Sequence, residues 1–287
     1  MITDKLYERV QAKSPLCVGL DLRLSYVPAE IAAEYASDED RLFEYAKMII
    51  KATCDVAACY KVQIACYEAL GLAGLRAYSR ILAYLRENAE IVIADVKRGD
   101  IASTAEEYAK GHFTGDFESD MVTLNPYMGL DAVSPYFPYF KDADKGCFVL
   151  VKTSNPSSCD FEEIQDKDGM PVYMSVLEKI KEWGSDLTGK SGYSAIGAVV
   201  GVNHLSQIQM VREAAKGKVF LLVPGFGAQG AKAEDIAALI GGEMGGVVNV
   251  SRGIIACHVG KEGNPADLIA EKAKSMAKEL TDACKSV

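Results

Sequence analysis

The chain has 287 residues, of which 49% are hydrophobic and 25% are charged, and its formal net charge at pH 7 is −9. This composition is typical of a soluble globular protein, and the acidic balance argues against nucleic acid or an anionic membrane surface as a partner. No apolar run reaches transmembrane length and residues Met1–Leu6 lack the apolar core of a signal peptide, so we expect a cytoplasmic protein.

Short apolar runs recur along the whole chain, with amphipathic segments between them. The runs start about 33 residues apart on average, which is the length of a strand, a loop and a crossover helix. Helical spacing is clearest in residues 75–85 and 269–283. The eight predicted strands begin near Leu16, Val56, Ile91, Met121, Cys147, Ala195, Val219 and Gly246.

Eight strand-helix units predict an α/β protein with a single (β/α)8 barrel over residues 1–287, because no linker or low-complexity tract divides the chain. A doubly wound sheet is the alternative, but no G-x-G-x-x-G motif follows the first strand. The polar segment of about residues 154–172, with its glycine and prolines, predicts a long loop after strand five. Asn203 and His204 follow strand six and predict a helix start, with Asn203 as its N-cap.

The third strand carries the most informative motif. Its apolar run, Ile91–Ala94, leads directly into Asp95, Lys97 and Asp100. Asp95 and Lys97 alternate with one residue, so on a regular strand both side chains leave the same face. Ionised groups at the end of a buried strand are unfavourable unless they pair with each other or bind a ligand. The motif therefore indicates either a functional site or an ordinary strand-end ion pair.

Other strand ends add polar groups at the same rim of the predicted barrel, where barrel enzymes place their active sites. The glycines after strands seven and eight would let backbone N–H groups approach an anion, and a helix following them would add its positive end. The guanidinium of Arg252 has a planar fork that suits phosphate oxygens. These loops predict a phosphate site. The strand ends are Val18–Asp21, Tyr60–Gln63, Asp95–Lys97, Leu124–Pro126, Lys152–Asn155, Pro224–Gly230 and Asn249–Gly253, and they include Asp21, Lys61 and Ser154.

The cysteines and histidines do not indicate a metal centre. The chain has eight cysteines but no C-x-x-C pair, and several lie in apolar runs, so we interpret them as reduced structural thiols of a cytosolic protein. The three histidines, His112, His204 and His258, have no regular ligand spacing. Neither a metal site nor a Ser-His-Asp triad is supported by these patterns.

Taken together, the motifs resemble the orotidine 5′-phosphate decarboxylase family, in particular its longer bacterial and archaeal subgroup with the signature Asp-x-Lys-Arg-Gly-Asp-Ile. The resemblance implies decarboxylation of orotidine 5′-monophosphate to UMP and carbon dioxide, the last step of de novo UMP synthesis. It also implies no metal, no organic cofactor and a homodimer with active sites at the subunit interface. The matching segments are Gly19–Asp21, Tyr60–Lys61, Asp95–Ile101, Ser154–Pro156, Pro224–Gly230 and Ser251–Gly253.

The resemblance further assigns roles to individual residues. Lys61, Asp95, Lys97 and Asp100 would form a charged tetrad, with Lys97 protonating C6 of the substrate. The other subunit would contribute Asp100, together with Ile101 and Thr104. The remaining roles are ribose contacts for Asp21 and Lys61, the pyrimidine edge for Ser154, substrate contact for Pro224, and phosphate binding for Gln229, Arg252 and the Gly253 N–H.

Two other functions stay open at this point. On the same kind of barrel, strand-end carboxylates could hold Mg²⁺ for a sugar-phosphate lyase or aldolase. Alternatively, the barrel could bind a nucleotide without catalysis, with the charged residues as structural ion pairs. Sensitivity to a chelator would indicate the first, and ligand binding without release of carbon dioxide would indicate the second.

Overall fold

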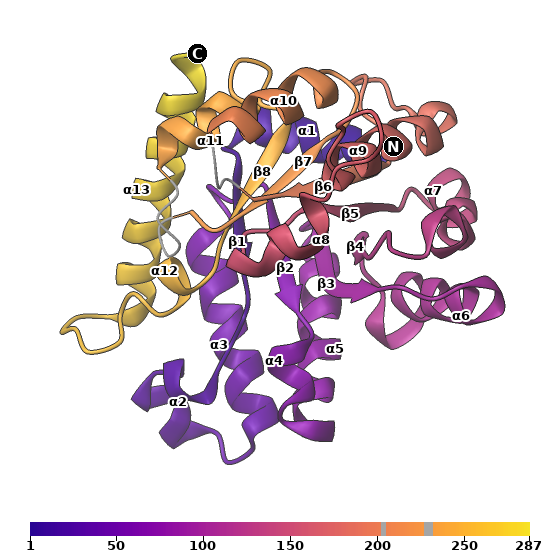
Figure 1. The fold of residues 1–287 in the computed structure, drawn as a ribbon. Coiled ribbons are helices and arrows are strands. Elements are labelled where there is room, and N and C mark those ends of the chain that lie inside the picture. Colours follow the sequence, from indigo (N-terminus) through magenta and orange to yellow (C-terminus); the bar gives the residue numbers. More distant parts are fainter. Residues whose placement is uncertain (202–204, 227–231) are drawn as a thin grey trace.

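The computed structural model describes residues 1–201, 205–226 and 232–287. Within these ranges eight parallel strands close into a barrel, each pairing with its neighbours in chain order and β1 pairing with β8 (Figure 1). The predicted (β/α)8 barrel is therefore confirmed. The strands are β1 (Leu16–Gly19), β2 (Cys59–Gln63), β3 (Val92–Arg98), β4 (Met121–Leu124), β5 (Gly146–Lys152), β6 (Ile196–Val200), β7 (Leu221–Pro224) and β8 (Gly246–Val250).

Most strands begin within one residue of the predicted position, but two begin later. The N–H groups of Val56 and Ala57 bond to the carbonyl of Thr53, so these residues finish a helix and β2 starts at Cys59. The N–H of Val219 likewise bonds to the carbonyl of Ala215, and β7 starts at Leu221. Both apolar runs include the last turn of a helix as well as the strand, and periodicity alone does not separate the two.

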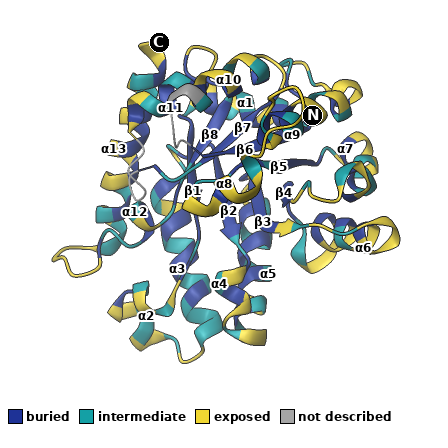
Figure 2. Cartoon of the chain, viewed as in Figure 1, coloured by how far each residue is buried: buried dark blue, intermediate teal, exposed yellow. Residues whose placement is uncertain are grey.

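Helices surround the barrel and turn their apolar sides toward it. Figure 2 shows the strands and the inner helix faces as buried, with exposed residues on the outer faces. The longer helices are α1 (Ile2–Ala12), α3 (Asp38–Thr53), α5 (Gly71–Glu87), α6 (Ala102–Phe113), α9 (Val172–Trp183), α10 (Leu205–Ala215), α11 (Ala233–Ile240) and α13 (Pro265–Lys285). The shorter ones are α2 (Ala29–Glu34), α4 (Ala65–Glu68), α7 (Phe137–Asp142), α8 (Cys159–Glu162) and α12 (Arg252–Ile255).

The two segments with helical spacing are confirmed as α5 and α13. Tyr78, Leu82 and Leu85 are buried on α5, as are Ile269 and Leu280 on α13. None of the described helices is both long and apolar enough to cross a membrane.

The segment after β5, predicted as a long loop over about residues 154–172, contains some regular secondary structure. It contains a 3₁₀ turn (Pro156–Ser158), the short helix α8 and an isolated bridge between Gln165 and Pro171, before α9 begins at Val172. Figure 1 shows α8 passing in front of the strands. The structure therefore places an ordered connection next to the carboxyl end of β5.

Candidate active site

Charged side chains from two adjacent strands meet at the carboxyl end of the barrel. The Lys61 Nζ lies 2.8 Å from Asp95 Oδ2, and the Lys97 Nζ lies 2.5 Å from Asp95 Oδ1. Lys61 also lies 3.5 Å from Asp21 Oδ1, and the Gln63 amide donates a hydrogen bond of 2.9 Å to Asp95 Oδ2. The side chains of Lys61 and Asp95 are only 7% and 8% exposed, whereas that of Lys97 is 46% exposed.

The three charges stabilise one another against burial. Burial by itself would raise the pKa of Asp95, but the ammonium groups of Lys61 and Lys97 outweigh it and lower that pKa to about 2. Burial disfavours the Lys61 ammonium, yet the carboxylates of Asp95 and Asp21 raise the Lys61 pKa above its ordinary value. Near neutral pH the cluster therefore contains a buried carboxylate and a buried ammonium, both ionised.

A bulge in β3 creates this geometry. Ala94 pairs with Val122 of β4 and Arg98 pairs with Leu124, so four steps along β3 face two along β4. Within the bulge Lys97 has a φ of +44°, a left-handed conformation that is uncommon for residues other than glycine. Asp95 and Lys97 do reach the same side, as the sequence predicts, but through this irregular backbone rather than through regular alternation.

Two adjoining cavities flank the charged cluster. One has a volume of about 380 Å³ and is bordered by Lys97, Thr123 and Ser154. The other has a volume of about 480 Å³ and is bordered by Asp21 and Arg252. Because both cavities also contact Lys61, Asp95, Pro224 and Asn249, they form one elongated site with charges at its centre. Their combined size is in the range of small-molecule sites.

The end of β1 passes very close to the end of β8 at the edge of this site. A Cβ on Gly19 would lie 2.0 Å from Ser251 Oγ, so only glycine fits there. The helix that follows β8, α12, is four residues long. An anion beside Arg252 and Gly253 would therefore depend on the guanidinium and on backbone N–H groups more than on a long helix dipole.

Other predicted site residues lie away from the cluster or outside the described ranges. The Asp100 carboxylate accepts a hydrogen bond from the Ile101 N–H, and Thr104 is exposed on α6. Ile101 borders a separate hollow with Pro135 and Tyr139. Among the described residues, Lys97 forms an ion pair with Asp95 and not with Asp100. Gln229, and the predicted helix start at Asn203 and His204, lie outside the described residues.

Sequence reasoning gave no role to four groups that the structure places in the site. Thr123 borders the first cavity, Arg23 and Gln63 border the second, and Asn249 borders both. Gln63 and Asn249 are polar residues at or near the carboxyl ends of strands, which is a usable signal. Thr123 stands within the apolar run of β4, where a threonine is easily read as a strand-forming residue.

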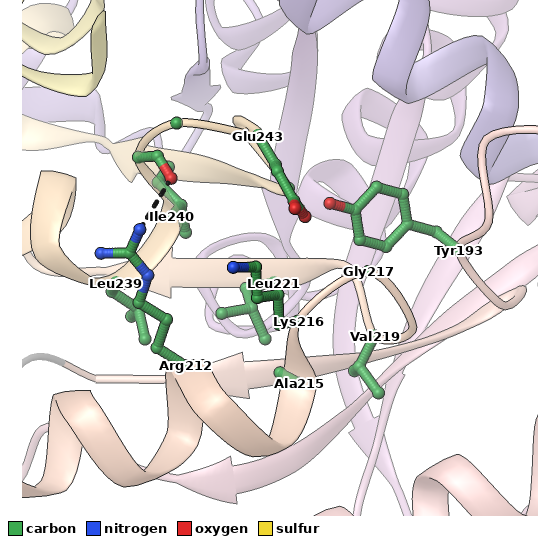
Figure 3. Close-up of a pocket in the computed structure, with 13 residues that line it drawn as sticks. Tyr193, Arg212, Ala215, Lys216, Gly217, Val219, Leu221, Leu239, Ile240 and Glu243 are labelled. Carbon is green, nitrogen blue, oxygen red and sulfur yellow. Dashed lines mark hydrogen bonds between the residues drawn. The ribbon is translucent and has the colours of Figure 1, made fainter. Parts of the chain in front are cut away.

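Another pocket lies at the opposite end of the barrel and is much smaller than the two cavities of the site (Figure 3). Its volume is about 130 Å³, and Figure 3 shows Tyr193 and Glu243 pointing toward one another across it. The Arg212 guanidinium is already engaged, donating hydrogen bonds of 3.0 and 3.4 Å to the carbonyls of Ala238 and Gly241. This pocket is small, and Arg212, one of the two cationic residues that line it beside Lys216, already stabilises the end of α11.

The described residues do not form a recognisable metal-binding cluster. Among them, no group of three or more His, Cys, Asp or Glu side chains is placed to hold a metal ion. All eight cysteines are free thiols, as the sequence predicts.

Comparisons with known proteins agree with one another. The profile of the orotidine 5′-phosphate decarboxylase / HUMPS family matches residues 14–261. The orotidine 5′-phosphate decarboxylase of Clostridium tetani is 52% identical over 258 residues, covering 90% of this chain and 89% of its own. That of Clostridium acetobutylicum is 50% identical over 282 residues, covering 98% of both chains. The structure of Leishmania donovani OMP decarboxylase is similar with a TM-score of 0.78 and 30% identity, covering 98% of each chain.

Proposed function

The chain belongs to the orotidine 5′-phosphate decarboxylase family, and we propose that it converts orotidine 5′-monophosphate to UMP and carbon dioxide, the last step of de novo UMP synthesis. It is accordingly a carboxy-lyase. The observation that carries the proposal is the ionised cluster of Lys61, Asp95 and Lys97 between two cavities at the carboxyl end of the barrel. No metal and no organic cofactor take part in the proposed reaction.

The chemistry explains why such a cluster is needed. When the bond between C6 and the carboxylate breaks, its electron pair stays on C6 in an orbital in the plane of the ring, where the π system does not delocalise it. Carbon dioxide leaves, and C6 must take up a proton. Without a cofactor, the barrier is lowered by charges that are already in place and by a proton donor at the carbon.

Lys97 is the proposed proton donor. Of the three clustered side chains it has the largest exposed fraction, and it borders the cavity that also contains Ser154. Its Nζ would transfer one proton to C6 and later recover one from solvent. Asp95, ionised at neutral pH, would lie near the substrate carboxylate, and the repulsion between them would be relieved as carbon dioxide departs.

The two cavities suggest how the nucleotide is oriented. The pyrimidine would lie in the cavity beside Lys97, with Ser154 at its edge and Pro224 at the junction. Asp21 and Lys61 would contact the ribose hydroxyls. The 5′-phosphate would lie beside Arg252 and the Gly253 N–H, in the second cavity, with Gln229 as a further contact.

We also propose a homodimer in which Asp100 completes the tetrad of the other subunit. Apolar side chains after β3 and β4 are unusually exposed: Ile101 is 48%, Tyr127 87%, Met128 49% and Leu130 41% exposed. Large apolar side chains exposed in this number after two adjacent strands are typical of a protein interface. Asp100 and Thr104 flank Ile101 and would then face the partner. We further propose that residues 1–287 form one domain and that the protein works in the cytoplasm, without nucleic acid or membrane partners.

The decisive experiment follows the absorbance of orotidine 5′-monophosphate with purified wild-type protein and the Lys97→Ala variant. The wild type should consume the substrate and release carbon dioxide, whereas Lys97→Ala should be inactive, keep its circular dichroism spectrum and still bind UMP. Lys51→Ala, which removes an exposed lysine on α3, is the matched control and should behave as wild type. Substantial decarboxylation by Lys97→Ala would reject Lys97 as proton donor.

The same assay separates the other two functions. Full activity after treatment with EDTA supports the proposal, and loss of activity that Mg²⁺ restores would indicate a metal-dependent lyase. Binding of UMP by the wild type without any release of carbon dioxide would indicate a non-catalytic nucleotide-binding barrel.

A further inference from the structure

The side chain of Thr123 lies where the bulge interrupts the regular pairing of β3 with β4. Ala94 and Arg98 pair with Val122 and Leu124, and Thr123 lies between those two β4 residues. Its Oγ1 accepts hydrogen bonds of 2.9 Å from the N–H groups of both Val96 and Lys97. One side chain therefore replaces the strand partner for two successive residues of β3.

The same hydroxyl also binds the catalytic carboxylate. Thr123 Oγ1 lies 3.0 Å from Asp95 Oδ1. A hydroxyl has one proton and two lone pairs, and both lone pairs here receive backbone N–H groups. An ionised carboxylate only accepts, so the Thr123 proton must be donated to Asp95. Every hydrogen-bonding position of this buried hydroxyl, whose residue is 1% exposed, is thus used.

We propose that Thr123 is a positioning residue that holds Asp95 and Lys97 in register for proton transfer. The oxygen to which it donates, Asp95 Oδ1, is the one that lies 2.5 Å from the Lys97 Nζ. The N–H that it binds belongs to Lys97 itself, whose φ of +44° is a conformation that surrounding contacts must maintain. The hydroxyl therefore fixes Lys97 at its backbone and, through Asp95, at its ammonium.

This inference rests on the proposed function, because it assigns Thr123 to the step in which Lys97 gives a proton to C6. Thr123→Val keeps the shape of the side chain and removes the hydroxyl, whereas Thr123→Ser keeps the hydroxyl. We expect kcat to fall about 100-fold in Thr123→Val, the effect typical of a displacement of about 1 Å at a reacting group. Thr123→Ser should stay within about threefold of wild type, and the dissociation constant of UMP should change little in either variant.

Thr53→Val is the matched control for the loss of a buried threonine hydroxyl. Thr53 is also fully buried, on α3, and its Oγ1 bonds to the Ile49 carbonyl and the Tyr60 hydroxyl, away from the site. Its kcat should equal that of wild type even if its melting temperature falls. Should Thr123→Val fail to fold, Thr123→Cys takes its place, because a thiol is a weak donor and acceptor and should give a kcat well below that of Thr123→Ser.

Several results would overturn the inference. Wild-type kcat in Thr123→Val, an equal loss in Thr123→Ser, an equal loss of UMP affinity and of kcat, or a similar loss in Thr53→Val would each show that the hydroxyl does not position Lys97. A wild-type protein that releases no carbon dioxide would instead reject the proposed function, so the two failures are distinguishable.

Discussion

Arg252 is exposed at the edge of the second cavity, where the proposed site needs a counter-charge for phosphate. The protein carries a net charge of −9, so an anionic substrate depends on cations placed locally. We predict that Arg252→Ala lowers kcat/KM about 10- to 100-fold, since hydrogen bonds to a charged group contribute roughly 1.5–3 kcal/mol. Steady-state kinetics would measure this. Arg76→Ala, on the exposed surface of α5, is the control, and an unchanged kcat/KM in Arg252→Ala would remove this residue from the site.

His112 predicts a dependence of stability on pH. Burial, and next the charge of Arg98, lower the His112 pKa from 6.5 to about 4, and its Nε2 accepts a hydrogen bond of 3.2 Å from Arg98 Nε. Between those two pH values the unfolded chain binds a proton that the folded protein does not. Stability should therefore decrease as the pH falls from 6.5 to 4, by at most about 3 kcal/mol from this residue.

Chemical denaturation of wild type and His112→Gln at several pH values would test this prediction. Glutamine can still accept the hydrogen bond from Arg98 but does not titrate. The free energy of unfolding of the variant should depend less on pH between 6.5 and 4 than that of wild type. An equal dependence in the two proteins would show that His112 is not responsible. Asp95 contributes in another window: because its pKa is lowered from 3.8 to about 2, its contribution to stability is complete above pH 3.8 and is lost as the pH falls from there to about 2.

At the scale of an element, the buried Lys152 holds the segment after β5 in place through ion pairs. The side chain of Lys152 is 1% exposed, and its Nζ lies 3.0 Å from Glu162 and 3.2 Å from Glu163. Glu162 in turn accepts hydrogen bonds from the N–H and the hydroxyl of Thr153, the residue before Ser154. The ion pair thus connects α8 to the strand end that borders the cavity beside Lys97.

We predict that Lys152→Met lowers the free energy of unfolding by about 2 kcal/mol, because Glu162, whose side chain is only 20% exposed, loses its charged hydrogen-bond donor. It should also speed tryptic cleavage after the exposed Lys167 in the same segment. Denaturant titration and limited proteolysis would measure the two effects. The control is Lys179→Met, which breaks an exposed ion pair on α9 and should change stability by less than about 1 kcal/mol. Equal changes in stability and in cleavage rate in the two variants would show that Lys152 does not stabilise this segment.

The elements also show how far the sequence predicts the structure. Strand order and barrel closure follow from the spacing of apolar runs, because each run must be covered on both faces. The pairing of Asp95 with Lys97 follows from their position at a strand end. The bulge does not follow, since the group that stabilises it, Thr123, lies 26 residues beyond Lys97 in another apolar run. Periodicity describes each strand separately, whereas the hydrogen bond between Lys97 and Thr123 joins two strands, so periodicity cannot predict it.

At the scale of the whole molecule, one chain leaves the proposed tetrad incomplete. Lys61, Asp95 and Lys97 meet within the chain, whereas the Asp100 carboxylate bonds to the Ile101 N–H beside an exposed apolar surface. The role proposed for Asp100 therefore rests on the family resemblance, because the contacts within one chain do not place Asp100 beside Lys97. If a second subunit covers this surface with two-fold symmetry, each active site receives Asp100 from its partner.

Mixing two inactive variants tests this arrangement. In a hybrid of Lys97→Ala and Asp100→Asn subunits, one site combines both substitutions and the other has native Lys97 and native Asp100. Equal amounts with random exchange should therefore recover about a quarter of wild-type activity, since half of the dimers are hybrids with one native site each. Mixing each variant with itself is the control. If subunit exchange is demonstrated by mass tags and no activity returns, Asp100 is not shared, because sites built within one chain would stay defective in every combination.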